Sequence, residues 1–392
     1  MLFSIACILL SGLLLGCLFS KLKLPSLLGM ILVGIIMSPY ALDLIDESIL
    51  NISADLRQIA LVIILTRAGL SLNLSDLKKV GRPAVLMCFL PACAELAGTV
   101  LLAPALLGVS LLDAAIMGSV IAAVSPAVIV PRMIRFIEEG YGTDKSIPQL
   151  ILAGASVDDV FVIVIFTAFT SLASTGNIKA SSFLQIPISI ILGILAGMIT
   201  GTLLVKFFRS FHMRDSIKLL IILSFSFLLI ELQNRLEGTI PISGLLAIMS
   251  LGIIINQKYN VLSHRLSQKY NKLWVAAEIF LFVLVGATVD LKYAISAGIS
   301  SIVLVLGALL FRMAGVLLSL ISTPLNKKEK LFCMIAYTPK ATVQAAIGAI
   351  PLAMGLPCGQ IVLTVAVLSI LITAPLGAIC IDNLYAKLLK RC

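Results

Sequence analysis

The sequence has 392 residues, of which 60% are hydrophobic and 12% are charged, and its mean hydropathy is +1.13. Soluble domains are about half apolar and about a quarter charged, so this composition excludes a soluble globular protein. The net charge of +10 would fit a nucleic-acid-binding protein, but the distribution of the basic residues along the chain argues against that interpretation.

Thirteen apolar runs follow one another along the chain. Most are roughly 17 to 28 residues long, near the length that crosses a hydrocarbon core as a helix, and they lack the alternation of barrel strands. The predicted spans are residues 2–19, 26–42, 56–73, 83–107, 111–136, 147–174, 181–208, 216–233, 240–256, 272–290, 297–322, 329–351 and 359–386. We therefore expect an all-α polytopic membrane protein with 13 transmembrane helices, which forms a single transmembrane domain over residues 1–392 without a soluble domain.

The basic residues alternate from one connecting segment to the next. The segments after odd-numbered spans, counted with the span ends that adjoin them and with the C-terminus, hold 22 of the 29 Lys and Arg residues, whereas the other segments and their adjoining span ends hold 4. This bias follows the positive-inside rule, and it predicts a cytoplasmic C-terminus and an N-terminus outside. We expect a multi-pass protein of the cell (inner or plasma) membrane, whose partner is the lipid bilayer and not a nucleic acid.

Two predicted spans carry prolines in mid-membrane. The run SPAVIVP at residues 125–131 interrupts the fifth span, and the run TPKAT at residues 338–342 interrupts the twelfth. Proline removes a helical N–H donor and clashes with the preceding turn, so each run predicts a bend or a break. If residues 181–208 form a connector, the two runs hold the same place in an inverted repeat of residues 1–174 and 216–388. Matching interruptions in two halves point to a transport site near the midplane.

Five charged residues lie in apolar surroundings: Glu95, Asp158, Asp159, Arg312 and Lys340. A charge at the bilayer centre costs at least about 2.5 kcal/mol, so such residues are usually paired or functional. Glu95 and Arg312 hold matching places in the two halves, which predicts a buried ion pair. If one aspartate pairs with Lys340, one carboxylate is left over. Lys340 also suits the neutralisation of a helix C-terminus, and the aspartates could cap a helix, although about eleven apolar or small residues precede them.

An unpaired carboxylate in a medium of low dielectric tends to hold a proton, which it can exchange for a hard monovalent cation that prefers oxygen ligands. The hydroxyls of Ser125 and Thr338, with carbonyls of unwound backbone, are candidate supporting ligands. Adjacent helical residues point about 100° apart, so the two aspartates do not face one site equally. The sequence leaves the choice between them open; our hypothesis takes Asp159 as the carrier of cation or proton and Asp158 as its partner-bound neighbour.

These motifs resemble those of the monovalent cation:proton antiporter-2 family, above all its NHA branch of sodium/hydrogen exchanger-like proteins. The resemblance rests on SPAVIVP, on GASVDD at residues 154–159, on TPKATVQAAIG at residues 338–348 and on SILITAP at residues 369–375. It implies an NhaA-like fold with two crossed discontinuous helices, and a homodimer. It also implies exchange of Na⁺ or Li⁺ for H⁺ by an elevator-like motion, with no enzymatic activity and no cofactor.

Residue by residue, the resemblance makes Asp159 the ion-binding aspartate and Asp158 its neighbour. Ser156 is a further candidate for the supporting ion site. The resemblance also pairs Glu95 with Arg312, which stands where many electrogenic relatives have a lysine. Because a buried lysine can lose its proton and an arginine effectively cannot, this departure favours one proton per cation. The expected exchange is therefore electroneutral.

Other functions remain open from the sequence alone. A sodium-coupled symporter of a small organic anion on a similar fold would need a larger substrate cavity. A K⁺/H⁺ antiporter would differ only in the size and dehydration energy of its ion. An intramembrane aspartyl protease is disfavoured because such enzymes place their aspartates on different helices, and a passive channel does not need a titratable pair.

Overall fold

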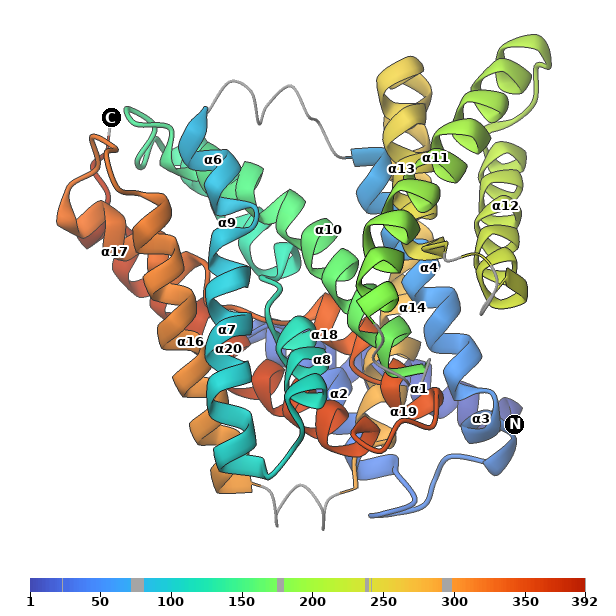
Figure 1. Cartoon of the computed structure of the whole chain (residues 1–392), viewed down its shortest axis with the longest axis horizontal. Coiled ribbons are helices and arrows are strands. Elements are labelled where there is room, and N and C mark those ends of the chain that lie inside the picture. Colours follow the sequence, from blue (N-terminus) through green and yellow to red (C-terminus); the bar gives the residue numbers. More distant parts are fainter. Residues whose placement is uncertain are drawn as a thin grey trace. The chain divides into compact units, whose positions relative to one another are not determined.

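The structure is a computed structural model of the chain, and it describes residues 1–22, 24–71, 81–174, 180–236, 240, 242–290 and 298–391. The described residues are mostly helical, and one isolated antiparallel bridge joins Tyr141 and Arg391. Figure 1 shows the helices, which are α1 (Leu2–Lys21), α2 (Ser26–Met37), α3 (Glu47–Asn51), α4 (Ser53–Ser71), α6 (Arg82–Met87), α7 (Leu90–Leu107), α8 (Leu111–Ile121), α9 (Pro126–Glu139), α10 (Ile147–Ser174), α11 (Ala180–Ser210), α12 (Asp215–Leu236), α13 (Gly244–Lys258), α14 (Asn260–Ala287), α16 (Gly298–Ser319), α17 (Lys327–Ala336), α18 (Thr342–Ile347), α19 (Ile350–Ala353) and α20 (Gly359–Leu388).

In the described part of the chain, 7 helical stretches are long and apolar enough to cross a membrane. They are Leu2–Lys21, Arg82–Leu107, Ile147–Ala173, Ile188–Ser210, Asn260–Ala287, Gly298–Ser319 and Gly359–Leu388. Shorter apolar stretches are Ser26–Met37, Leu111–Ile121, Gly244–Lys258 and Thr342–Ala353. The predicted class, an all-helical protein of the membrane, is confirmed, and the number of thirteen spans stays a prediction.

Two predicted boundaries differ from the structure by five residues or more. α2 ends at Met37, although its span was expected to reach residue 42, because Ser38 adopts an extended backbone with ψ of 159°. Ser38 precedes a proline, and a residue in that position disfavours the helical region. α14 begins at Asn260, twelve residues before the expected start at 272. This first part of α14 is polar, so hydropathy alone does not reveal it.

Contacts divide the chain into two units. The first comprises Met1–Asp55, Ser75–Val162 and Ile279–Cys392, and the second comprises Leu56–Leu74 and Ile163–Glu278. All of the charged residues singled out by their apolar surroundings belong to the first unit. The site is therefore described within that unit.

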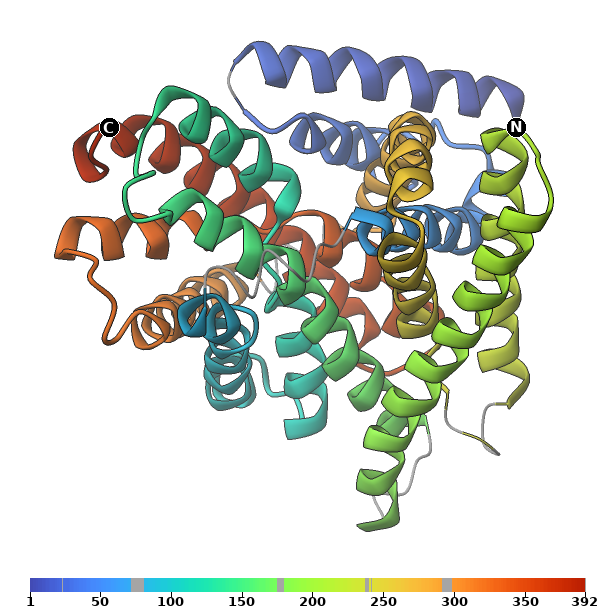
Figure 2. The same ribbon diagram turned by 90° about the horizontal axis from the view of Figure 1, so that it is seen from above.

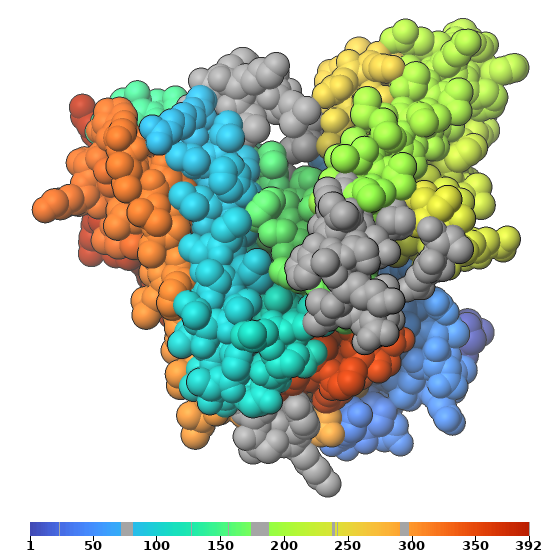
Figure 3. Space-filling model, viewed as in Figure 1, coloured from blue at the N-terminus to red at the C-terminus, as the bar shows by residue number. Residues whose placement is uncertain are grey.

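Helices of the first unit approach one another closely through small residues. α7 and α16 lie side by side (Figure 3), and a side chain at Gly315 of α16 would meet the backbone of Pro91 in α7. α1 likewise runs along α2 (Figure 2). Small residues let helix backbones pack closely in a membrane, where lipid is as apolar as the side chains. The contact of α7 with α16 brings the helix that carries Glu95 against the helix that carries Arg312.

The second unit is built on the same principle. α11 packs along α13, and three glycines of α11 at four-residue spacing, Gly193, Gly197 and Gly201, lie against that helix. Side chains at these positions would meet the backbone of α13 or of its N-cap residue, Ser243. The four-residue spacing places all three glycines on one face of α11, which makes it the contact face for α13.

Both predicted interruptions are present. The chain leaves the helical conformation at residues 122–125, between α8 and α9, and at residues 337–341, between α17 and α18; we call these segments the first and the second break. Pro126 takes the first helical position of α9, where a missing N–H is tolerated. The Ser125 N–H donates to the Pro339 carbonyl at 2.8 Å, so the two breaks lie against each other.

Candidate functional site

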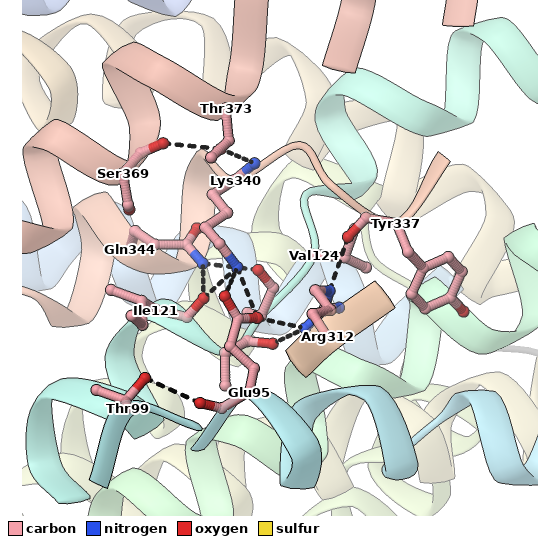
Figure 4. Close-up of polar contacts among 12 residues, drawn as sticks. Glu95, Thr99, Ile121, Val124, Arg312, Tyr337, Lys340, Gln344, Ser369 and Thr373 are labelled. Atoms are coloured by element: carbon pink, nitrogen blue, oxygen red, sulfur yellow. Dashed lines mark hydrogen bonds and ion pairs between the residues drawn. The ribbon is translucent and has the colours of Figure 1, made fainter. Parts of the chain in front are cut away.

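Four charged side chains meet beside the two breaks. They are Glu95 of α7, Asp158 of α10, Arg312 of α16 and Lys340 of the second break, and each is at most 1% exposed. Arg312 Nη1 lies 3.0 Å from Glu95 Oε2, and its Nη2 lies 2.9 Å from Asp158 Oδ2. Lys340 Nζ lies 2.7 Å from Glu95 Oε1 (Figure 4). Two acids and two bases thus form a charge-balanced cluster, which we call the four-residue network.

The pairing differs in one respect from the arrangement expected from the sequence. The structure places Glu95 against Arg312, but Lys340 contacts Glu95 and not an aspartate. Arg312 contacts Asp158 as well, because a guanidinium presents five N–H donors in a planar fork and can bind two carboxylates at once. An aspartate was expected to pair with Lys340, but Asp158 pairs with Arg312 instead.

The two cations also bind carbonyls at the ends of helices. Lys340 Nζ donates to the Ile121 carbonyl at 2.5 Å, and Arg312 Nη1 donates to the Ala122 carbonyl, both at the C-terminus of α8. Arg312 Nε donates to the Tyr337 carbonyl, at the C-terminus of α17, at 2.7 Å. These carbonyls have no partner within their helices and carry the negative end of the helix dipole. Lys340 thus lies at a helix C-terminus, although at that of α8 and not of the helix that precedes it.

Gln344 joins the two breaks, a role that the sequence analysis missed. Its Oε1 accepts from the Ala341 N–H at 2.9 Å, and its Nε2 donates to the Ala123 carbonyl at 2.7 Å. The Lys340 N–H donates to Thr373 Oγ1 of α20 at 3.0 Å, which holds the second break from another side. The sequence did contain a signal for this role: Gln344 is a single amide side chain in an apolar stretch, four residues after Lys340.

We expect the substitution Gln344→Met to destabilise the protein by about 2 kcal/mol, because the Ala341 N–H and the Ala123 carbonyl would both lose a buried partner. The measurement is thermal unfolding of the purified protein in detergent. Gln268→Met, at an exposed position of α14, is the matched control and should unfold like the wild type. Equal unfolding temperatures of Gln344→Met and the control would show that the amide does not hold the breaks.

The two adjacent aspartates have different surroundings. Asp158 is fully buried, and its Oδ2 accepts from the Val124 N–H at 2.7 Å as well as from Arg312. Asp159 is half-buried, and its carboxylate forms no hydrogen bond or ion pair with any described residue. Since Asp158 takes up the remaining charge of Arg312, Asp159 is the carboxylate that the network does not neutralise.

The three hydroxyl residues expected to support an ion lie differently. The buried Ser125 Oγ has no hydrogen-bond partner among the described residues, and Ser125 follows Val124, whose N–H contacts Asp158. Thr338 Oγ1 donates to the Ile335 carbonyl at 2.8 Å within α17. The side chain of Ser156 lies outside the described residues. Of these three residues, Ser125 is thus the one that the first break places next to the contact with Asp158.

The chain resembles several known proteins. A family model described as "Sodium/hydrogen exchanger, transmembrane" matches residues 5–386. "Sodium/hydrogen exchanger 9B2" of Homo sapiens is 33% identical over 383 residues, which cover 94% of this chain and 70% of that protein. "Sodium/hydrogen exchanger 9B1" of Homo sapiens is 34% identical over 388 residues, which cover 94% of this chain and 73% of that protein.

A solved structure has the same fold. The sodium proton antiporter MjNhaP1 from Methanocaldococcus jannaschii, at pH 8, superposes with a TM-score of 0.84 and covers 98% of this chain and 97% of its own. The sequence identity is 21%, so the likeness concerns the fold alone.

Proposed function

Because the chain belongs to the sodium/hydrogen exchanger family, a family of membrane transporters and not of enzymes, we propose that it exchanges Na⁺ or Li⁺ for H⁺ at Asp159. The observation that carries this proposal is the balance of the four-residue network. Two acids and two bases neutralise one another in contact, and the adjacent carboxylate of Asp159 has no such partner among the described residues. That carboxylate is available to a proton or a cation.

Competition for one carboxylate couples the two ions. A bare carboxylate in a medium of low dielectric is costly, and either a proton or a monovalent cation removes that cost. Oxygens are the ligands that hard cations prefer, and Asp158 Oδ1 and Ser125 Oγ are buried oxygens without a hydrogen-bond partner in the described part of the chain. They are the supporting ligands that we propose beside Asp159. Since the site holds one occupant at a time, each ion leaves before the other binds.

Labelled Na⁺ uptake into proteoliposomes, driven by a pH gradient alone, tests this function. We expect uptake against a Na⁺ gradient, with no uptake in protein-free liposomes. A requirement for an added organic anion would instead support a sodium-coupled symporter. Uptake of K⁺ in place of Na⁺ in the same assay would support a K⁺/H⁺ antiporter.

We further propose that one proton moves for each cation, so that exchange is electroneutral. Arg312 keeps its charge throughout, and it contacts both Glu95 and Asp158. Lys340 is held by Glu95 and by the Ile121 carbonyl, so its charge is already balanced. We expect the rate of Na⁺-driven proton flux to be unchanged when a membrane potential is imposed with an ionophore. A rate that rises or falls with the potential would contradict this stoichiometry.

The remaining features of the proposal concern architecture and setting. We propose thirteen spans in an inverted repeat of residues 1–174 and 216–388, with the connector 181–208, and an elevator-type alternation of access in a homodimer. The two breaks that lie against each other support the repeat, because each falls at the same place in its half. The bias of basic residues supports a cytoplasmic C-terminus in a cell membrane.

A further inference from the structure

The second unit contains a basic cavity where α11 ends and α12 begins, near the start of α14. Figure 1 shows these three helices. The volume of the cavity is about 920 Å³. The charged residues in its lining are Arg209, Arg214, Lys218, Arg265, Lys269 and Asp215. Asp215 pairs with Arg265, whose Nε lies 3.2 Å from its Oδ2. The other bases of the lining have no acidic partner among the described residues, so the cavity carries an excess of positive charge.

Lys218 is the lining residue that points most directly to a ligand. It is only 5% exposed, yet it lines the cavity. Its Nζ lies 5.7 Å from the centre of the Phe208 ring, and it forms no hydrogen bond or ion pair with a described residue. Burying an ammonium group without an anionic partner is costly. An anion bound in the cavity would remove that cost.

The neighbouring donors are already held in place. Lys269 Nζ donates to Ser216 Oγ at 3.1 Å, beside the start of α12. Arg209 Nη2 donates to the Lys258 carbonyl at 2.6 Å, and its guanidinium lies 5.5 Å from the centre of the Tyr259 ring. A lining with several Lys and Arg side chains favours a ligand with several charged oxygens, and phosphate is a group that such side chains bind well.

We propose that this cavity binds a phosphate group, carried either by an anionic phospholipid or by a soluble phosphate compound. Exposed apolar side chains of α11 and α12 lie close in sequence to the lining residues, among them Leu203, Phe207 and Leu220. They would suit the acyl chains of a lipid whose headgroup enters the cavity. The basic residues involved belong to segments that the positive-inside rule assigns to the cytoplasm, where anionic lipids and soluble phosphates both occur.

The test measures the dissociation constants of two probes for the purified chain in detergent: pyrophosphate and a water-soluble short-chain phosphatidic acid. We expect Lys218→Met to weaken binding by about tenfold, because a hydrogen bond to a charged group is lost. Arg214→Gln, at an exposed position of the lining, should weaken binding about threefold. If Lys218→Met fails to fold, Arg214→Gln still tests the role of the cavity. Lys206→Met, an exposed base of α11 outside the lining, is the matched control and should bind like the wild type.

The two probes distinguish the sources of the phosphate. Binding of phosphatidic acid without pyrophosphate would assign the cavity to a lipid headgroup, and binding of pyrophosphate would assign it to soluble phosphates. The proposal is overturned if neither probe binds, or if Arg214→Gln binds both as tightly as Lys206→Met does. The assay measures ligand binding without transport, so its outcome is independent of the proposed exchange.

Discussion

The substitution Asp159→Asn is expected to reduce Na⁺-driven proton movement in proteoliposomes to the level of liposomes without protein. Asparagine has nearly the shape of aspartate, but its amide neither takes up nor releases a proton. It also replaces a charged cation ligand by a neutral one, which lowers cation affinity by about ten- to a hundredfold. Because Asp159 has no partner in the described residues, its replacement leaves the four-residue network intact. The variant should therefore fold like the wild type.

Two comparisons make this result specific. Glu138→Gln removes an exposed acid of α9 and should exchange at the wild-type rate. Asp158→Asn removes a partner of Arg312, and should lower the stability of the protein as well as its transport rate. Exchange by Asp159→Asn at a rate close to that of Glu138→Gln would refute the assignment of Asp159 as carrier.

The substitution Lys340→Met is expected to destabilise the protein by about 3–5 kcal/mol, because it breaks a buried ion pair and leaves one partner charged. In this variant Glu95 and Asp158 would share Arg312 as their only cation in the network. The Ile121 carbonyl would also lose its donor from Lys340. The measurement is thermal unfolding in detergent, with Lys328→Met, an exposed base of α17, as the control.

A second substitution should reverse part of this loss. In the double variant Glu95→Gln, Lys340→Met, a single acid, Asp158, faces a single base, Arg312, so the charges balance again. We expect it to be more stable than Lys340→Met alone by about 1–3 kcal/mol, the size of coupling found between residues in contact. If the two substitutions instead destabilise additively, charge balance does not govern the stability of this cluster.

Local chemistry made part of the site predictable from the sequence. The breaks follow from prolines, which lack the N–H donor that an uninterrupted helix would need at their positions, and the buried charges stand out from apolar runs. The first part of α14 was not predicted, because its residues from Asn260 onwards are polar. Hydropathy reports the solvent that a segment prefers, and not whether its backbone is helical.

The sharing of partners within the network was not predictable in the same way. The sequence counts two bases against three acids, and the count alone allows several pairings. That Arg312 binds both Glu95 and Asp158 depends on how α7, α10 and α16 pack, and packing arises from contacts between distant residues. The function of Gln344 depends equally on the first break lying against the second.

The network has a consequence for the order in which this protein is made. Its ion pairs join residues that are 154, 217 and 245 positions apart. Synthesis from the N-terminus therefore delivers Glu95 and Asp158 to the membrane well before Arg312 and Lys340 exist. Until then both acids lack their basic partners in an apolar medium, which is costly. Closure of the network is thus a late step of folding, and it makes the early helices depend on the last third of the chain.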